Sequence, residues 1–169
     1  MILRTVTMDD LEVVSRNWRL DECVVSREEA VEAITRMRDR HAQNASGKVL
    51  HLCLAIFAKD SGDFVGWCGL DHSNRDWPHP VLFYALKTCY WGKGLATEAA
   101  MAVLEYAFGV LELDEVDAGA AADNPASVRV LHKLGMRYAG RDDQGGHAFA
   151  LTRQEHQAQN SARGTTCRC

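Results

Sequence analysis

The sequence has no excess of positive charge, no long apolar run and no leader-like start. Its 169 residues carry 19 Lys and Arg against 23 Asp and Glu, a formal net charge of −4, so the basic face that non-specific nucleic-acid binding requires is not expected. No apolar stretch approaches the roughly 18 residues of a membrane span. Residues 1–5 lack the basic start and long apolar segment of a signal peptide. We therefore expect no nucleic-acid partner, no membrane partner and a cytoplasmic location.

The cysteines also lack the spacing of a zinc site. Three of the six lie in apolar, strand-like segments, where a free cysteine acts as a small hydrophobe. Only Cys167 and Cys169 are close together, and no histidine or cysteine follows at zinc-finger spacing. We therefore expect no bound metal. The other four cysteines are Cys23, Cys53, Cys68 and Cys89.

The apolar patterning predicts one mixed α/β domain. A run of antiparallel strands comes first and two helical crossovers follow, which implies a mixed sheet covered by helices. We expect the domain to span residues 1–153, and residues 154–169 to form a polar, mobile tail. Strands are expected at 2–6, 49–58, 64–70, 81–86, 115–118, 136–140 and 147–152. Helices are expected after Asp9 and Asp10, after the capping box of Ser26 and Glu29 to residue 43, at 95–111, and from Asn124 to Gly135.

The strongest chemical signal is the stretch 90–99, Tyr-Trp-Gly-Lys-Gly-Leu-Ala-Thr-Glu-Ala, between a strand and a helix. Glycine lets the main chain approach a ligand closely, and a helix start offers unpaired amides with a partial positive charge. Together they suit a diphosphate. A turn without any ligand is the alternative. The Walker pattern is absent, and a dinucleotide-binding pattern would need a small residue where Thr97 stands, so a nucleotide-binding oxidoreductase is a weak alternative.

This stretch resembles the central motif of the GNAT superfamily of N-acetyltransferases, Arg/Gln-x-x-Gly-x-Gly/Ala. Gly94 and Ala96 match its glycine and small residue, whereas Trp91 replaces its first position. The longer pattern is similar to the branch that acetylates ribosomal-protein N-termini (RimJ/RimL-like). The resemblance implies a GNAT fold, a mixed and mostly antiparallel sheet of about six or seven strands with about four flanking helices. It also implies acetyl-coenzyme A (acetyl-CoA) as co-substrate.

A second segment, 124–136, is similar to that branch's Asn-x-x-Ser-x-x-x-Leu-x-Lys-Leu-Gly-Phe. By resemblance, Asn124 bonds the pantetheine arm and Ser127 lies near the thiol, although both residues also suit a plain helix cap. An amide near Leu86, at the splayed end of the fourth strand, would polarise the thioester carbonyl. The coenzyme A (CoA) contacts implied in this way are Leu86, Trp91, Gly92, Lys93, Gly94, Leu95, Ala96, Thr97, Asn124 and Ser127.

Two proton-transfer groups common in the family are missing. Val81 stands where many members place a glutamate that acts as general base. Leu131 stands where many place a tyrosine that acts as general acid. In their place we take His72, His79 and Ser127 as the catalytic candidates, the histidines acting through water on the amine and Ser127 on the thiolate. Further candidates are Asp71, Asp76 and His132, with Trp77 as a wall of the acceptor site and Trp67 as a core residue.

The missing base favours an amine that loses its proton easily. An α-amine has a pKa of roughly 8 and a lysine of roughly 10.4, so neutralising them at pH 7 costs about 1.4 and about 4.6 kcal/mol. We expect transfer of acetyl to a protein or peptide N-terminal α-amine. A small-molecule amine, such as a polyamine or an amine antibiotic, and a non-catalytic acyl-CoA-binding module are the alternatives. Both monomers and homodimers occur in the family, so either state is expected.

Overall fold

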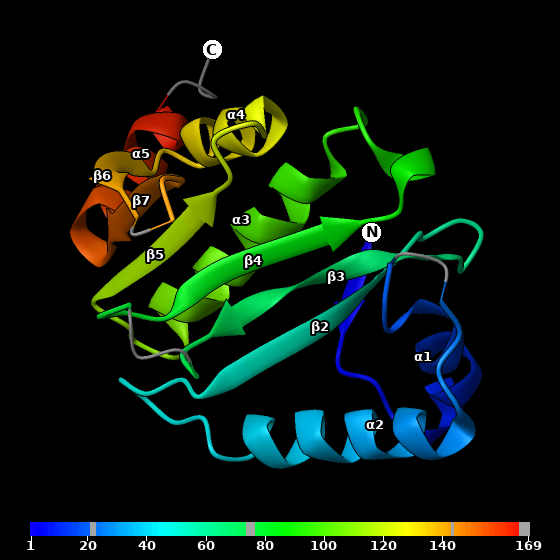
Figure 1. Ribbon diagram of the computed structural model, residues 1–169. Helices are drawn as coiled ribbons and strands as arrows, with labels where there is room; N and C mark the ends of the chain where they lie inside the picture. The colour runs from blue at the N-terminus through cyan, green and yellow to red at the C-terminus, as the bar shows by residue number, and fades with distance from the viewer. Residues whose placement is uncertain (21–22, 74–76, 143, 166–169) are drawn as a thin grey trace.

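A single sheet with helices on both faces forms the protein (Figure 1). The computed structural model describes residues 1–20, 23–73, 77–142 and 144–165, and only the main chain of 163–165. Within these residues the sheet has seven strands in the order β1-β2-β3-β4-β5-β7-β6. Every neighbouring pair is antiparallel except β4 and β5, which run parallel. The strands are β1 (Ile2–Arg4), β2 (His51–Phe57), β3 (Phe64–Asp71), β4 (Val81–Leu86), β5 (Glu115–Ala120), β6 (Arg137–Arg141) and β7 (His147–Thr152).

The helices form one layer on each face of the sheet. Helices α1 (Leu11–Asn17) and α2 (Arg27–His41) cover the face at β2 and β3, and α3 (Leu95–Gly109), α4 (Pro125–Lys133) and α5 (Arg153–Thr165) lie on the other (Figure 1). Two short 3-10 helices, η1 (Met8–Asp10) and η2 (Thr88–Tyr90), precede α1 and follow β4. Across the described residues, no helix combines the length and apolar character needed to cross a membrane.

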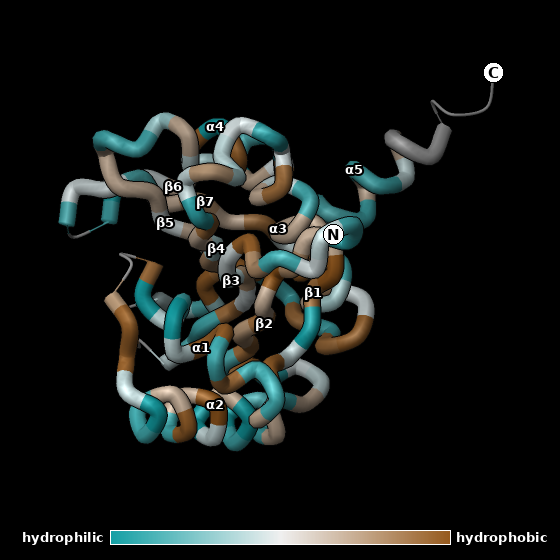
Figure 2. The backbone as a smooth tube through the Cα atoms, turned by 90° about the vertical axis from the view of Figure 1, so that its right-hand side faces the viewer, coloured by the Kyte–Doolittle hydropathy of each residue, from teal (hydrophilic) through white to brown (hydrophobic). Residues whose placement is uncertain are grey.

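Alternation along the strands divides the apolar residues between two cores. Successive side chains of a strand point to opposite faces, so Leu52 and Ile56 of β2 pack toward α3, whereas Ala55 and Phe57 pack toward α1 and α2. The side view in Figure 2 shows the hydrophobic segments gathered in the central strands. The predicted mixed, mostly antiparallel sheet is therefore confirmed, and its central strands are held from both sides.

The predicted helix starts are confirmed at their caps. The Ser26 hydroxyl accepts from the Glu29 amide at 3.1 Å, and the Glu29 carboxylate accepts from the Ser26 amide at 2.8 Å, so α2 begins at Arg27. At α4, the Asn124 side-chain oxygen accepts from the Ser127 amide at 3.0 Å, with Pro125 in the first turn. Such short-range bonds explain why the starts can be located from the sequence.

Residues 154–165, expected as part of a polar, mobile tail, form helix α5 together with Arg153. A reciprocal pair of bonds between Thr152 and Glu155 starts it. Its inner face is polar: the buried His156 ring lies 5.0 Å from the Phe108 ring, and the Gln159 side chain donates to the Gly135 carbonyl at 2.9 Å. A helix that packs through histidine and glutamine has no apolar stripe to reveal it. Cys167 and Cys169 lie outside the described residues.

Candidate active site

Strand β4 is paired along its whole length on one side and only at its start on the other. Its residues 81–86 face β3 throughout, but β5 pairs only with Val81 and Leu82, through Asp117 and Ala118. Beyond Leu82 the two parallel strands diverge. The Lys87 amide bonds β3, at the Val65 carbonyl, and peptide groups alternate along a strand. The peptide groups of Tyr84 and Leu86 therefore face the gap that β5 leaves.

A cleft of about 1580 Å³ opens at this gap. It exceeds the usual volume of a small-ligand pocket, roughly 300–1,000 Å³, so it has room for a ligand larger than a typical small molecule. Its walls come from α1 and the residues after it, the end of β4, η2 and the start of α3, and the start of α4. Among the lining residues are Val13, Arg16, Asn17, Arg19, Leu20, Tyr84, Ala85, Leu86, Trp91, Gly92, Gly94, Leu95, Ala96, Thr97, Asn124, Ser127, Arg129 and Lys133.

The turn into α3 presents unbonded main-chain amides to this cleft. Gly92 and Gly94 have φ angles of +74° and +77°, which side-chain-bearing residues rarely adopt. The first helical bond of α3 runs from the Glu98 amide to the Gly94 carbonyl. In the described part of the chain, the amides of residues 92–97 have no hydrogen-bond partner. They stand at the start of a 15-residue helix, where unpaired amides and the helix dipole suit an anion.

Two neighbouring side chains brace this turn. The exposed Trp91 donates from its indole Nε1 to the Leu86 carbonyl at 2.8 Å, which ties the turn back to the end of β4. The Lys93 ammonium lies 5.2 Å from the centre of the Tyr90 ring. Of the predicted CoA contacts, Lys93 is the one that is absent from the cleft lining. The aromatic residue at position 91 therefore shapes the turn.

Across the cleft, the start of α4 meets β4. The Tyr84 hydroxyl lies 2.7 Å from the Ser127 hydroxyl oxygen and 3.3 Å from the Ser127 carbonyl. Burial raises the pKa of Tyr84, against the opposing hydrogen bond from Ser127. Asn124 uses its side-chain oxygen for the helix cap, which leaves its amide NH₂ group to donate to a ligand. Tyr84 was not predicted as a site residue.

Comparison with known proteins identifies this arrangement. Residues 1–137 match the model of the acetyltransferase (GNAT) domain. This chain belongs to the GNAT acetyltransferase family. It is therefore an acyltransferase, and the family uses acetyl-CoA as co-substrate.

Relatives and solved structures agree with this GNAT assignment. An uncharacterized N-acetyltransferase p20 of Bacillus licheniformis is 22% identical over 148 residues, covering 83% of this chain and 80% of its own. The ribosomal-protein-S5-alanine acetyltransferase of Vibrio fischeri has a TM-score of 0.75 at 17% identity, covering 89% and 92% of the two chains. The spermidine/spermine N-acetyltransferase SpeG of Vibrio cholerae has 0.67 at 15%, covering 94% and 98%. The structures share the fold.

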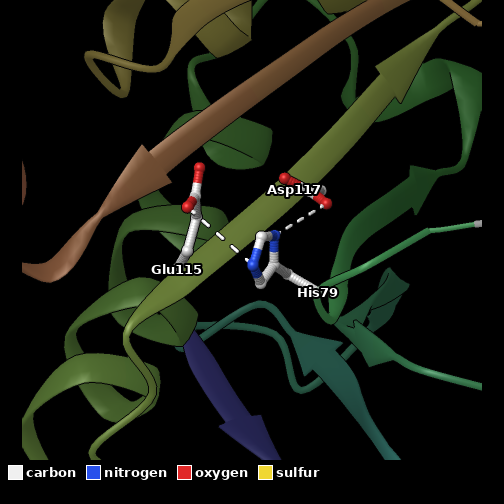
Figure 3. A group of neighbouring side chains, drawn as sticks. All are labelled: His79, Glu115 and Asp117. Carbon is white, nitrogen blue, oxygen red and sulfur yellow. Dashed lines mark hydrogen bonds and ion pairs between the residues drawn. The ribbon is translucent and has the colours of Figure 1, made fainter.

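The predicted base His79 lies outside the cleft lining, near the start of β4 (Figure 3). Its Nδ1 is 3.3 Å from an Asp117 carboxylate oxygen and its Nε2 is 3.9 Å from Glu115. Burial raises the pKa of the Asp117 carboxyl, against the charge and hydrogen bonds of His79. Asp117 pairs with Val81, one step before the strands diverge. This GNAT domain thus has a histidine–carboxylate pair beside the position where many members carry a glutamate.

The same three side chains are the ones that could hold a metal ion. Among the described residues, His79, Glu115 and Asp117 form one group whose potential ligand atoms lie within 4.8 Å of one another. The Arg137 guanidinium already donates to Glu115 at 2.6 Å, so a cation would compete with an existing ion pair. The expectation of no metal stays a prediction.

The other described residues of the predicted acceptor loop, His72 and Asp71, do not line the cleft. His72 donates its amide to the Leu50 carbonyl at 3.0 Å, and its side chain does not line the cleft. Burial acts to raise the pKa of Asp71, but hydrogen bonds from Ser73 and His51 outweigh it and leave the pKa lowered. Asp76 lies outside the described residues.

The remaining aromatic candidates pack against the fold. Trp77 lies over Gly119 of β5, where an added Cβ would meet its ring at 3.5 Å. Trp67 is a buried core residue, as expected, and donates to the Asn17 carbonyl. The His132 ring stands edge-on to Phe149 at 5.3 Å. Among the described residues, none of these three side chains lines the cleft.

Proposed function

We propose that this chain transfers the acetyl group of acetyl-CoA to an N-terminal α-amine of a protein or peptide. The observation that carries the proposal is the row of unbonded amides at residues 92–97, beside the gap between β4 and β5. Amides at a helix start suit the two phosphates of CoA. The cleft beside them, with a volume of about 1580 Å³, has room for the rest of the carrier. In this proposal Gly92, Gly94, Leu95, Ala96 and Thr97 supply the diphosphate contacts.

The pantetheine arm is proposed to take the place of the missing part of β5. The Tyr84 peptide group and the Leu86 amide face that space, so an extended amide chain can pair with them as a strand would. The Leu86 carbonyl keeps its bond from the Trp91 indole. The Asn124 NH₂ group can donate to the same arm from the start of α4. The Leu86 amide is then placed to polarise the thioester carbonyl, because donors aimed at a developing oxyanion lower the barrier.

Removal of a proton from the amine is assigned to His79, oriented by Asp117. Asp117 stands one residue before Ala118, at the fork where β5 leaves β4, and a proton would pass from the amine to His79 through water. His72 has no comparable carboxylate partner among the described contacts, so His79 is the better of the two candidates. A histidine base suits an amine with a pKa of roughly 8 better than one of roughly 10.4.

The charge of the cleft favours such an acceptor over a polycation. Its described walls carry five cationic side chains and one acidic one: Arg16, Arg19, Lys87, Arg129 and Lys133 against Glu12. Like charges repel a spermidine-like amine. One structural neighbour is a ribosomal-protein acetyltransferase and another acts on spermidine and spermine. The charge of the cleft supports our proposal that this chain belongs with the ribosomal-protein (RimJ/RimL-like) branch.

Paired acceptors test the proposal. Purified protein is incubated with acetyl-CoA and one of three acceptors. These are a peptide with one internal lysine and a free N-terminus, the same peptide with its N-terminus blocked, and spermidine. Product mass and thiol release are measured. We expect acetylation of the free N-terminus at least tenfold faster than either other acceptor. Equal rates on the free and blocked peptides would remove the α-amine assignment. CoA binding with no thiol release from any acceptor would favour the non-catalytic module.

A further inference from the structure

Two hydroxyl groups meet across the cleft, on elements that are far apart in the sequence. Tyr84 comes from the diverging part of β4, and Ser127 comes from the first turn of α4. Their oxygens lie 2.7 Å apart, and both residues line the cleft. Tyr84 also packs against the core beneath α3, so its ring has a fixed position. A held pair of hydroxyls on the wall of a catalytic cleft is suited to moving a proton.

The same region lacks the hydroxyl that the family often supplies from α4. Leu131, at that position, is fully buried at 0% exposure and belongs to the core. It does not line the cleft, and its hydrocarbon side chain has no proton to donate. A departing thiolate still needs a proton after the carbon–sulfur bond breaks. Among the described residues, the tyrosines that line the cleft are Tyr84 and Tyr90. The Tyr84 hydroxyl is the one that meets the Ser127 hydroxyl.

We propose that the Tyr84 hydroxyl is the proton donor to the CoA thiolate, and that Ser127 positions it. The inference rests on the proposed acetyl transfer. The amine nitrogen forms the new carbon–nitrogen bond, the carbon–sulfur bond breaks, and its electron pair stays on sulfur. The Tyr84 proton then passes to that sulfur. Tyr84 regains a proton from solvent through the Ser127 hydroxyl, and the proton lost by the amine leaves through His79.

The proton affinities of donor and acceptor are compatible with this step. Burial raises the pKa of Tyr84, so the hydroxyl keeps its proton at neutral pH. A tyrosine in water has a pKa of roughly 10 and a thiol of roughly 8.5, which would make the transfer unfavourable there. Burial raises thiol values strongly as well: the pKa of Cys53 and that of Cys68 reach about 12 in this sheet. A thiolate shielded from water in the cleft becomes a better base by the same effect.

Tyr84→Phe tests the assignment because it removes only the hydroxyl. With an acceptor that the wild-type protein uses, kcat is expected to fall about 100-fold or more. The KM for acetyl-CoA and the Kd of CoA are expected to change less than about threefold, because the ring remains. The pH profile of kcat is expected to lose its alkaline limb, which reports ionisation of the donor. Tyr138→Phe, an exposed tyrosine on β6, is the matched control and should behave as wild type.

Ser127 variants separate the two roles and keep the test open if Tyr84→Phe does not fold. Ser127→Ala is expected to lower kcat about tenfold and shift the alkaline limb, and Ser127→Thr, which restores a hydroxyl, is expected to recover most of the rate. Unchanged kcat in Tyr84→Phe, or a larger loss in Ser127→Ala than in Tyr84→Phe, would overturn the donor assignment alone. Wild-type protein that acetylates no amine would instead overturn the proposed function on which the inference rests.

Discussion

The two ends of β4 have opposite surroundings within one short strand. At Val81 and Leu82 the strand has a neighbour on both sides, β3 and β5. At Tyr84 and Leu86 it has β3 alone, and the other side faces the cleft. Leu82 is buried at 3% exposure, whereas Trp91, just beyond the open end, is exposed at 64%. One end is part of a continuous sheet and the other ends in a ligand-sized gap.

This comparison teaches where an enzyme of this fold can place its main-chain chemistry. Peptide groups that are buried without partners are costly, so nearly all are paired in folded proteins. Within the described ranges, unpaired amides persist where water or a ligand can reach them, as at residues 92–97 and at the open end of β4, where the Leu86 carbonyl is bonded to Trp91 but the amide is not. We therefore expect changes at the open end to weaken CoA binding with little effect on stability, and changes at the closed end to act on stability.

The largest effect is expected for Gly94→Ala at the open end. No atom lies within 4 Å of the added Cβ, so there is no clash, but a φ of +77° costs alanine about 1–2 kcal/mol. The turn should relax and the amides should no longer converge. We expect CoA affinity, measured by calorimetry, to fall at least about tenfold. Gly109→Ala, which also adds a Cβ into open space but at an ordinary φ, should bind like wild type. Equal affinities for the two variants would contradict the role of the turn.

A smaller loss is expected for Trp91→Phe, which keeps an aromatic ring but removes the indole donor to Leu86. A hydrogen bond of this kind contributes about 1 kcal/mol, so the Kd for CoA should rise about fivefold. The melting temperature should stay within about 2 °C, because the residue is exposed. A drop in melting temperature with unchanged affinity would mean that Trp91 stabilises the sheet and does not shape the site.

The smallest change in free energy is expected in the stability of Asp117→Asn, at the closed end. Because the folded-state pKa of Asp117 is raised, the folded protein holds this proton more tightly than the unfolded chain. Stability is therefore highest below the unfolded pKa of roughly 3.9 and declines as pH rises through the folded value. Asparagine removes that decline. The free energy of unfolding in urea is measured for both proteins at each pH. The difference, wild type minus Asp117→Asn, should fall by less than about 1 kcal/mol between pH 3 and pH 7.

Asp10→Asn serves as the control of opposite sign. Hydrogen bonding to the Arg4 guanidinium lowers the pKa of Asp10, despite an opposing effect of burial. Its stabilisation is present above the unfolded pKa and is lost as pH falls through the folded value. The difference in free energy of unfolding, wild type minus Asp10→Asn, should therefore rise between pH 3 and pH 7. The same sign for both carboxylates would show that their surroundings do not differ in the way the contacts indicate.

Much of the fold could be predicted because its signals are local. The capping box of Ser26 and Glu29 and the Asn124 cap involve residues three apart, and the start of β4 at Val81 follows directly from its apolar run. Helix α5 was not predicted, because its contacts use His156 and Gln159 in place of an apolar stripe. The Thr152 and Glu155 pair is the one local signal that could have indicated it.

The sequence by itself determined the turn of glycines before α3 and the caps of the helices, because steric limits on φ and bonds between near neighbours act within a few residues. Only the tertiary structure decided that β5 leaves β4 after Leu82, that Tyr84 meets Ser127 and that Asp117 holds His79. These last two pairs are separated by 43 and 38 residues. Contacts over such separations depend on how strands diverge and layers pack, and no pattern of neighbouring residues records that.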